Sequence, residues 1–251
     1  MTSKYDFTGH KIAVTGAGKG IGRATVIALH KANAEKIIAI TRTQADLDSL
    51  VQETNDDGKI IPVCADLSNQ KFMPDLEKVF AEHDCDMLVN NAGTGGLTSF
   101  DDMTEENYDR IMQVNLKSAT FIAQAFSKNF KSKNGSIVNI SSQAAFVPLP
   151  QHTSYCISKA GMDMLTKMMA LELGSKNIRI NSCNPTVVMT DLGKSAWSDP
   201  VKAETVLKKI PLRKFAEVDE VVQPILFLLS DAASMVNGCC LPVDGGYVNC
   251  N

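Results

Sequence analysis

Several features that define common protein classes are missing from this sequence of 251 residues. No apolar stretch approaches the roughly 18 residues that a membrane-spanning helix needs. Residues 1–10 are polar and lack the apolar core of a signal peptide. The formal net charge of −3 leaves no basic excess that could bind a nucleic-acid backbone. We therefore expect a cytoplasmic protein that neither inserts into a membrane nor binds nucleic acid.

The sequence also lacks the spacing of a metal site or of a disulfide framework. Its cysteines form no Cys-x-x-Cys pair, and its histidines show no ligand spacing. An odd number of scattered thiols is typical of reduced, mostly buried cysteines. We therefore expect no metal ion. A regulatory redox role for Cys250, the last residue but one, stays open.

Short β-branched runs alternate with longer helical patterns along the chain, and no hairpin signal joins two of the runs. Such alternation predicts an α/β protein whose parallel sheet is covered by helices on both faces. We expect a doubly wound, Rossmann-type sheet of seven strands in a single domain over residues 1–251, because no linker-like segment divides the chain. The expected strands are residues 11–15, 37–41, 60–64, 87–90, 136–141, 178–183 and 241–243.

Two segments depart from this simple alternation. Residues 186–214 contain no strand pattern and are longer than a connection needs, so we expect a lid that covers a substrate; a plain loop is the alternative. The helix expected over residues 153–173 is apolar over more than one sheet-facing stripe. Self-association would bury the surplus apolar surface.

A glycine-dense turn follows the first expected strand. Gly16, Gly18, Gly20 and Gly22 lie between an apolar strand and a helical pattern. Glycines at such a turn let the backbone approach a pyrophosphate, whose charge is met by the N–H groups of the helix start. The turn therefore predicts a nucleotide site, with a merely flexible turn as the alternative.

Tyr155 and Lys159 are four residues apart in the long expected helix, and Ser142 follows the fifth strand. An i,i+4 pair projects from one helix face, so the ammonium can lie beside the phenol and lower its pKa. A tyrosine tuned in this way can act as an acid near neutral pH. A solvated surface pair is the alternative for the two residues taken alone.

Further motifs support the catalytic alternative. Asp66 follows the third strand, Asn91, Ala92 and Gly93 follow the fourth, and Asn184-Pro185 ends the sixth. With the glycine turn and the tyrosine–lysine pair, these motifs resemble the short-chain dehydrogenase/reductase family from about residue 8 to about residue 247. The resemblance implies an oxidoreductase with a nicotinamide cofactor.

The resemblance also implies four catalytic roles. Tyr155 would be the general acid of carbonyl reduction and Ser142 a hydrogen-bond donor to the same oxygen, with Ser141 as the competing hydroxyl. Lys159 would lower the pKa of Tyr155 and hold the ribose of the cofactor. Asn115, in a helix that begins near Thr104, would hold water in a proton relay.

NADP(H) is the expected cofactor. At the end of the second strand, Thr41 and Arg42 replace the acidic residue with which NAD-selective members bind the ribose, and Lys19 adds a cation within the glycine turn. Asp66 would hold the adenine amino group. The residues expected to bind the cofactor are Gly16, Gly18, Lys19, Gly20, Ile21, Gly22, Thr41, Arg42, Asp66, Leu67, Asn91, Ala92, Gly93, Tyr155, Lys159, Pro185, Val188 and Thr190.

The resemblance is strongest to the branch of the family that reduces ketopentoses and α-dicarbonyl compounds, although residues 144–151 do not follow that branch. It suggests a homotetramer. An acyl-carrier or steroid substrate is the alternative within the family, and a non-catalytic NADP(H)-binding scaffold is the alternative outside it. The residues expected at the carbonyl or sugar substrate are Ser142, Gln143, His152, Tyr155 and Trp197.

Overall fold

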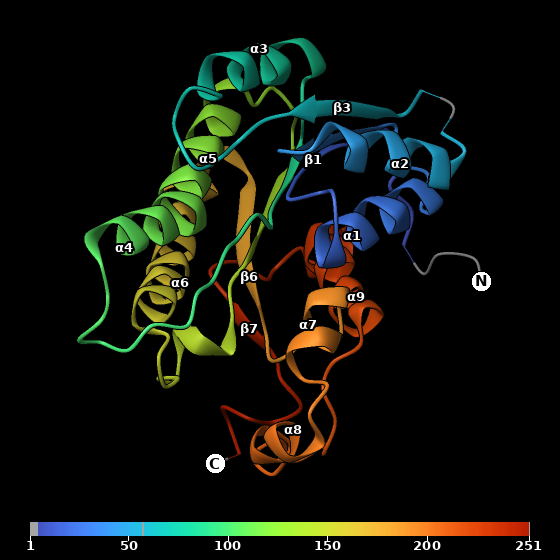
Figure 1. The fold of residues 1–251 in the computed structure, drawn as a ribbon. Helices are drawn as coiled ribbons and strands as arrows, with labels where there is room; N and C mark the ends of the chain where they lie inside the picture. Colours follow the sequence, from blue (N-terminus) through green and yellow to red (C-terminus); the bar gives the residue numbers. More distant parts are fainter. Residues whose placement is uncertain (1–4, 57, 251) are drawn as a thin grey trace.

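The seven strands form one parallel sheet in the order β3-β2-β1-β4-β5-β6-β7, with helices on both faces (Figure 1). This computed structural model describes residues 5–56 and 58–250, so the expectation for residues 1–10 lies partly outside the described residues. The doubly wound, seven-stranded parallel sheet is confirmed. The strands are β1 (Lys11–Thr15), β2 (Lys36–Thr41), β3 (Ile60–Cys64), β4 (Met87–Asn90), β5 (Gly135–Ile140), β6 (Ile178–Pro185) and β7 (Cys240–Val243).

Strand order decides where a ligand can bind. The chain runs outward from β1 to β2 and β3, and then returns to place β4 on the other side of β1. The carboxyl ends of β1 and β4 therefore lie side by side where the winding reverses. In open α/β sheets this crevice is the usual ligand site, and the glycine turn and Asn91 both follow these strand ends.

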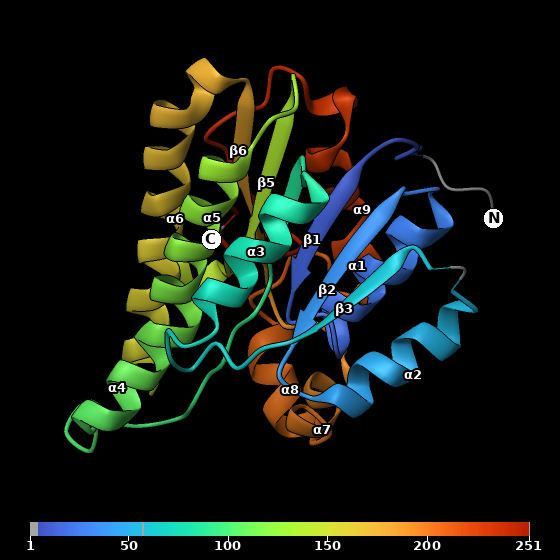
Figure 2. The ribbon, with the colours of Figure 1, turned by 90° about the horizontal axis from the view of Figure 1, so that it is seen from above.

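Two apolar clusters hold the helices to the sheet. One contains Val14, Leu29 and Leu228 on the face covered by α1, α2 and α9, and the other contains Leu88, Phe80 and Phe126 on the face covered by α3, α5 and α6 (Figure 2). The helices are α1 (Gly20–Lys31), α2 (Gln44–Thr54), α3 (Met73–His83), α4 (Glu105–Met112), α5 (Ser118–Asn129), α6 (Thr153–Leu173), α7 (Asp191–Ala196), α8 (Pro200–Leu207) and α9 (Val218–Leu229).

The central strands are buried in nearly every position because both of their faces are covered. Each residue of β4 and β5 is buried, whereas the edge strand β3 alternates buried or half-buried with exposed residues. Continuous apolar runs are therefore typical of the middle of this sheet and alternation of its edge. No helix among residues 5–56 and 58–250 is both long and apolar enough to cross a bilayer.

Several strand boundaries differ from the sequence-based expectation, and β2 and β7 each begin one residue earlier than expected. β5 begins and ends one residue earlier than expected, and β6 extends to Pro185 because that residue still pairs with Val243 of β7. The helix expected from Thr104 does begin there, since the Thr104 hydroxyl accepts from the Asn107 amide. It continues, however, into a π-helical turn, Gln113–Lys117, which carries Asn115.

Residues 186–214 contain the short helices α7 and α8 in place of a plain loop. The outer surface of α6 leaves Met164, Met168 and Leu171 exposed, with Leu171 77% accessible. An apolar surface beyond the sheet-facing stripe is therefore present, as the sequence predicts.

A buried carboxylate ties the amino ends of two central strands together. Asp86, just before β4, accepts from the Lys11 amide at 2.9 Å and lies 2.7 Å from Nδ1 of His10. The hydrogen bond with Asp86 raises the pKa of His10. A raised pKa means that protonated His10 contributes stability below its unfolded pKa of about 6.5, which is lost as pH rises through the folded value.

Replacing His10 with Gln should therefore flatten the pH dependence of stability. We expect the unfolding free energy of the unmodified protein to fall by about 1 kcal/mol from pH 6 to pH 8 because of this pair, and this fall to be absent in His10→Gln. Urea denaturation at both pH values measures it. Equal slopes in the two proteins would contradict the assignment.

Candidate active site

The glycine turn is closed too tightly to accept side chains at its two ends. A Cβ on Gly22 would lie 2.3 Å from the Gly16 carbonyl oxygen and 2.4 Å from Nδ2 of Asn91, and Gly16 has a φ of +65°. Asn91 Nδ2 donates to the carbonyls of Thr15 at 2.9 Å and Gly16 at 3.2 Å. The ends of β1 and β4 are thus joined through one amide side chain.

The start of α1 fits an anionic group. Its N-cap residue, Lys19, has extended backbone angles and makes no side-chain cap. The first N–H groups of the helix, from Gly20 onward, therefore keep their hydrogen-bonding capacity and their partial positive charge. A cradle lined by glycine backbone and an uncapped helix start matches a pyrophosphate.

The end of β2 supplies the next part of the candidate nucleotide site. Thr41 Oγ1 would lie 2.9 Å from a Cβ on Gly18, so the glycine turn and β2 are in close contact. Arg42 and Lys19 are exposed, and the Lys19 ammonium lies 3.8 Å from the Asp46 carboxylate. Both expected cations therefore lie at this edge, with Lys19 in an ion pair with Asp46.

Sequence reasoning missed one residue here, Arg23. Arg23 donates from one guanidinium to the carbonyls of Gly18 at 3.2 Å and Asp46 at 3.1 Å and pairs with Glu53 at 2.7 Å. It thereby fixes the turn to α2. The only available signal was its position directly after Gly22, at the point where the helix leaves the turn.

Asp66 lies at the end of β3 with its carboxylate in a tight local turn. It accepts from the Ser68 amide at 3.0 Å and from the Ser68 hydroxyl at 2.9 Å. These bonds, and more weakly the charge of Arg42, lower the pKa of Asp66. Asp66 does not cap α3, which begins only at Met73. The neighbouring Leu67 is buried, and its carbonyl accepts from Gln113.

Asn115 is completely buried in the π turn and its amide is occupied by protein groups. Its Oδ1 accepts from the Thr94 amide at 2.7 Å. Its Nδ2 donates to the Thr94 carbonyl at 2.9 Å and to the Ser158 hydroxyl at 3.0 Å. The side chain thus joins the loop after β4 to α6, and both of its donor hydrogens are used within the chain.

Ser142, Tyr155 and Lys159 come together as the sequence predicts. The Tyr155 phenol hydrogen-bonds with Ser142, whose hydroxyl also accepts from the Ala144 amide at 3.1 Å. Ser141 instead turns away and donates to the Lys159 carbonyl at 3.2 Å. Of the two adjacent hydroxyls, Ser142 is therefore the one at the phenol.

The Lys159 ammonium lies beneath this cluster. It donates to the Ile140 carbonyl at 2.8 Å and lies 5.7 Å from the centroid of the Tyr155 ring. A Cβ on Gly93 would be 3.6 Å from both Lys159 Nζ and Asn115 Oδ1. The loop after β4 therefore passes directly over the ammonium.

The expected lowering of the tyrosine pKa does not hold in this structure. Burial raises the pKa of Tyr155, and the hydrogen bond with Ser142 only partly counters it. Burial also lowers the pKa of Lys159 to about 8, against the opposing charge of Asp163. Desolvation outweighs the attraction of the pair because both charged forms lose water.

The remaining cofactor residues lie around the end of β6. Pro185 closes β6, Val188 bridges to Ala216, and Thr190 caps α7 by accepting from the Gly193 amide at 3.1 Å. The Thr190 methyl would be 3.1 Å from a Cβ on Gly20. The start of the α7–α8 segment therefore touches the glycine turn. Ile21 is half-buried in α1, and the Ala92 amide donates to Thr15 Oγ1 at 3.0 Å.

Two of the three other expected substrate residues lie near the phenol. Gln143 is buried and its Oε1 has no partner among the described residues. His152 sits at the start of α6, where its ring meets Tyr155 edge-on at 6.2 Å and Nδ1 lies 2.6 Å from the Pro150 carbonyl. Gln143, directly after Ser142 in the chain, thus carries a buried acceptor that the described residues leave without a partner.

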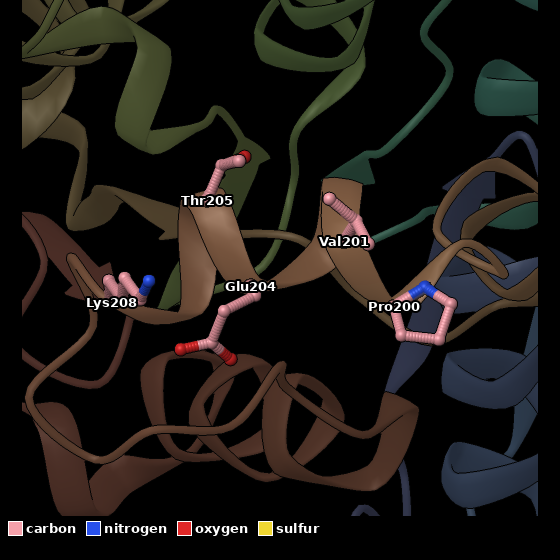
Figure 3. A pocket seen from close by; sticks show the side chains of 5 residues that line it. All are labelled: Pro200, Val201, Glu204, Thr205 and Lys208. Atoms are coloured by element: carbon pink, nitrogen blue, oxygen red, sulfur yellow. The ribbon is translucent and has the colours of Figure 1, made fainter.

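Trp197 lies at the end of α7 and holds the α7–α8 segment together. Its ring contacts Phe215 at 5.5 Å, and the Lys202 ammonium lies 4.8 Å from its centroid. These contacts indicate that Trp197 anchors the α7–α8 segment, whereas the sequence predicts a contact with the substrate. The outer side of α8 carries a hollow of about 470 Å³, to which no predicted site residue contributes (Figure 3). It is lined by Pro200, Val201, Glu204, Thr205 and Lys208.

A doubly wound sheet with a glycine cradle, a half-buried tyrosine and a buried serine and lysine at one edge defines the class of dinucleotide-dependent oxidoreductases. A family model described as enoyl-(acyl carrier protein) reductase matches residues 16–248. The chain belongs to the short-chain dehydrogenase/reductase family, and it is an oxidoreductase of the sugar or carbonyl reductase kind that uses a nicotinamide cofactor.

Individual relatives agree with this family over nearly the whole chain. The L-xylulose reductase of Caenorhabditis elegans is 49% identical over 99% of this chain and 100% of its own. The carbonyl reductase (NADPH) 2 of Sus scrofa is 44% identical over 98% of this chain and 99% of its own. A candidate NAD(P)-dependent gluconate 5-dehydrogenase from Beutenbergia cavernae, solved with NADP at low occupancy, is 30% identical, with a TM-score of 0.91 over 96% of this chain and 98% of its own.

The buried ammonium of Lys159 should be costly for stability at neutral pH. Its side chain is almost fully buried, and burial lowers its pKa from the usual 10.5 to about 8. Because the pKa of Lys159 is lower in the folded protein than in the unfolded chain, the free energy of unfolding rises with pH from about 8 to about 10.5. Below about pH 8 the full cost of burying the charge is present. The cost is about 3 kcal/mol at pH 7.

Replacing Lys159 with Met should therefore stabilise the protein at pH 7 by about 2 kcal/mol, after about 1 kcal/mol is lost with the bond to Ile140. The gain should disappear by pH 10, where the unmodified amine is neutral in the folded protein. Urea denaturation from pH 6 to pH 10 measures both trends. A variant that is less stable at pH 7 would show that the charge is not penalised.

Proposed function

We propose that the protein is an NADPH-dependent carbonyl reductase of ketopentoses, such as L-xylulose, and of α-dicarbonyl compounds, such as diacetyl. The observation that carries the proposal is the cluster of Ser142, Tyr155 and Lys159 beside the glycine cradle. The names of two relatives, an L-xylulose reductase and an NADPH carbonyl reductase, support the substrate and cofactor classes.

Tyr155 is the proton donor of the reduction. The bound nicotinamide would supply the hydride, and the phenol gives its proton to the carbonyl oxygen as that oxygen becomes negative. A raised pKa keeps the phenol protonated at neutral pH, which is the form that reduction requires. Ser142 already accepts from the Ala144 amide, so its hydrogen is available to the same oxygen.

Lys159 and Asn115 act from below the phenol. With a pKa of about 8, Lys159 is mostly charged at pH 7 and stabilises the negative charge that develops on the phenol oxygen as its proton leaves. Its ammonium lies under Gly93, where it can hold the ribose hydroxyls of the cofactor. Because both donor hydrogens of Asn115 are used, we assign its side chain to positioning the Thr94 loop against α6 and not to holding water.

Selectivity for NADPH follows from the edge near β2. Arg42 presents a planar set of donors that suits a 2′-phosphate, and Lys19 stands on the same side of the cradle. Asp66, which is held in its charged form by Ser68, is placed to accept from the adenine amino group.

The substrate pocket and the assembly complete the proposal. Gln143 accepts from a substrate hydroxyl through its unpaired Oε1, with His152 beside it. The α7–α8 segment acts as a lid on the single domain, and Trp197 anchors that lid. The apolar outer surface of α6 associates with other copies of the chain in a homotetramer. The enzyme works in the cytoplasm.

The decisive assay follows NADPH absorbance with L-xylulose and with diacetyl, with NADH as the matched cofactor control. We expect oxidation of NADPH by both compounds and much slower oxidation of NADH. A panel that adds 3-oxoacyl and steroid ketones separates the alternative substrate class. Activity on the 3-oxoacyl or steroid ketones without activity on L-xylulose or diacetyl would contradict the proposed substrate class. If no ketone were reduced, the non-catalytic NADP(H)-binding scaffold would be the remaining hypothesis.

Replacing Tyr155 with Phe should lower kcat at least about 100-fold, because a positioned general acid contributes a factor of about 10² to 10⁴. The Kd of NADPH, measured by fluorescence titration, should change little because the ring is kept. Retained turnover in Tyr155→Phe would overturn the assignment of the proton donor.

Replacing Arg42 with Ala should raise the KM of NADPH by about 10- to 100-fold, the loss expected for hydrogen bonds to a charged phosphate. The KM of NADH should stay nearly constant, since NADH lacks that phosphate. Lys78→Ala, which removes an exposed cation from α3, is the control. A similar rise for both cofactors would show that Arg42 supports the fold of the site and does not select the phosphate.

A further inference from the structure

Asp163 is a buried carboxylate that the proposed mechanism does not use. It lies in α6 one turn after Lys159 and is only 6% exposed. Buried carboxylates are rare unless donors or a cation compensate them. Its position beneath the reacting groups raises the question of what it contributes there.

The carboxylate is held by donors from β6. Asn184 Nδ2 lies 2.8 Å from Oδ2 and 3.1 Å from Oδ1 of Asp163, and the Ser182 hydroxyl lies 3.1 Å from Oδ1. An ionised carboxylate only accepts hydrogen bonds, and the Asn184 amide donates to it. The single Ser182 hydrogen is shared between Asp163 and Asn184 Oδ1, which lies 2.7 Å from the hydroxyl. The carboxylate is therefore held mainly by Asn184.

Two connections lead from Asp163 to the reacting groups. Through space, the negative charge of Asp163 acts on Lys159 from the next turn of the helix. Burial lowers the pKa of Lys159, and the charge of Asp163 raises it. Through bonds, the same Asn184 amide that contacts Asp163 also lies 3.2 Å from the Ser142 carbonyl. Asp163 thus touches neither the phenol nor the serine hydroxyl but is linked to both of their supports.

We propose that Asp163 is a positioning residue that keeps Lys159 protonated beneath Tyr155 and, through Asn184, fixes the backbone of Ser142. This inference rests on the proposed function of the site. It assigns a task to a residue for which the sequence offers no motif.

Other titratable groups around the pair are few among the described residues. Cys240 of β7 lies 3.9 Å from the Asp163 carbonyl, and burial raises its pKa, so its thiol is neutral at working pH. Tyr155 and Cys156 lie on the turn of α6 before Lys159, and Lys167 lies on the turn after Asp163. The charge on Asp163 is thus the negative one that acts on the Lys159 ammonium.

The test compares Asp163→Asn with two controls over pH 6 to pH 10. We expect kcat of the unmodified protein with saturating NADPH and L-xylulose to fall above about pH 8, and this alkaline limb to move down by about one pH unit in Asp163→Asn. At pH 8 the variant should then be about tenfold slower than at pH 6, whereas the unmodified protein should be only about twofold slower. Asp163→Ser is the second neutral variant if Asp163→Asn does not fold.

The controls separate charge from fold. Asp86→Asn removes a carboxylate that is equally buried at the other end of the sheet, and Ser182→Ala removes one donor to Asp163 but keeps its charge. Both should keep the alkaline limb of the unmodified protein. A limb that does not move in the neutral Asp163 variants, or that moves as far in Asp86→Asn, would overturn the inference.

A second measurement needs no turnover. Urea denaturation of the unmodified protein should show stability rising with pH from about pH 8, and this rise should begin about one unit lower in the neutral Asp163 variants. If the unmodified protein reduces neither L-xylulose nor diacetyl, the proposed function fails while this measurement still tests the link between Asp163 and Lys159. An unchanged onset would overturn the link even in an active enzyme.

Discussion

The tie between the carboxyl ends of β1 and β4 is the constraint on which the site depends. One amide, that of Asn91, donates to two consecutive carbonyls, and the absence of a side chain at Gly22 lets the turn close on it. A central pair of strands held at their ends in this way fixes the crevice where the winding reverses. The cradle, the loop over Lys159 and the start of α1 all take their positions from this contact.

Burial governs the chemistry at the other side of the crevice. Simple attraction between an ammonium and a phenolate predicts a lowered tyrosine pKa, but desolvation acts on both groups and reverses the outcome for Tyr155. The protein is thereby arranged as a protonated acid above a cation whose charge is costly to keep. Such a site needs compensation nearby, and this is the physical reason why a buried carboxylate follows one helical turn later.

Local pattern was sufficient for the sheet and for the residues within motifs. All seven strands could be predicted because each contains a short β-branched or apolar run between helical patterns, and only their ends shifted by one or two residues, as with Pro185. Ser142 and Tyr155 meet because each is fixed by its own element. Arg23 and Asp163 could not be predicted, since a charged residue in a helix carries no mark of the carbonyl or amide that it meets across the fold. The π turn at Asn115 was likewise hidden, because no residue type defines it.

That π turn sets the rotational register between α4 and α5. A five-residue turn is an α-helix with one residue inserted, and each α-helical residue rotates the following segment by about 100°. By absorbing the extra residue locally, Gln113–Lys117 lets Asn115 face inward while Ile122 and Phe126 of α5 still point at the sheet. Deleting one residue from this turn would regularise the helix and swing the apolar stripe of α5 away from the strands that it covers. The π turn thus allows the continuous helical segment of α4 and α5 to place Asn115 at the ligand crevice and the apolar residues of α5 against the sheet.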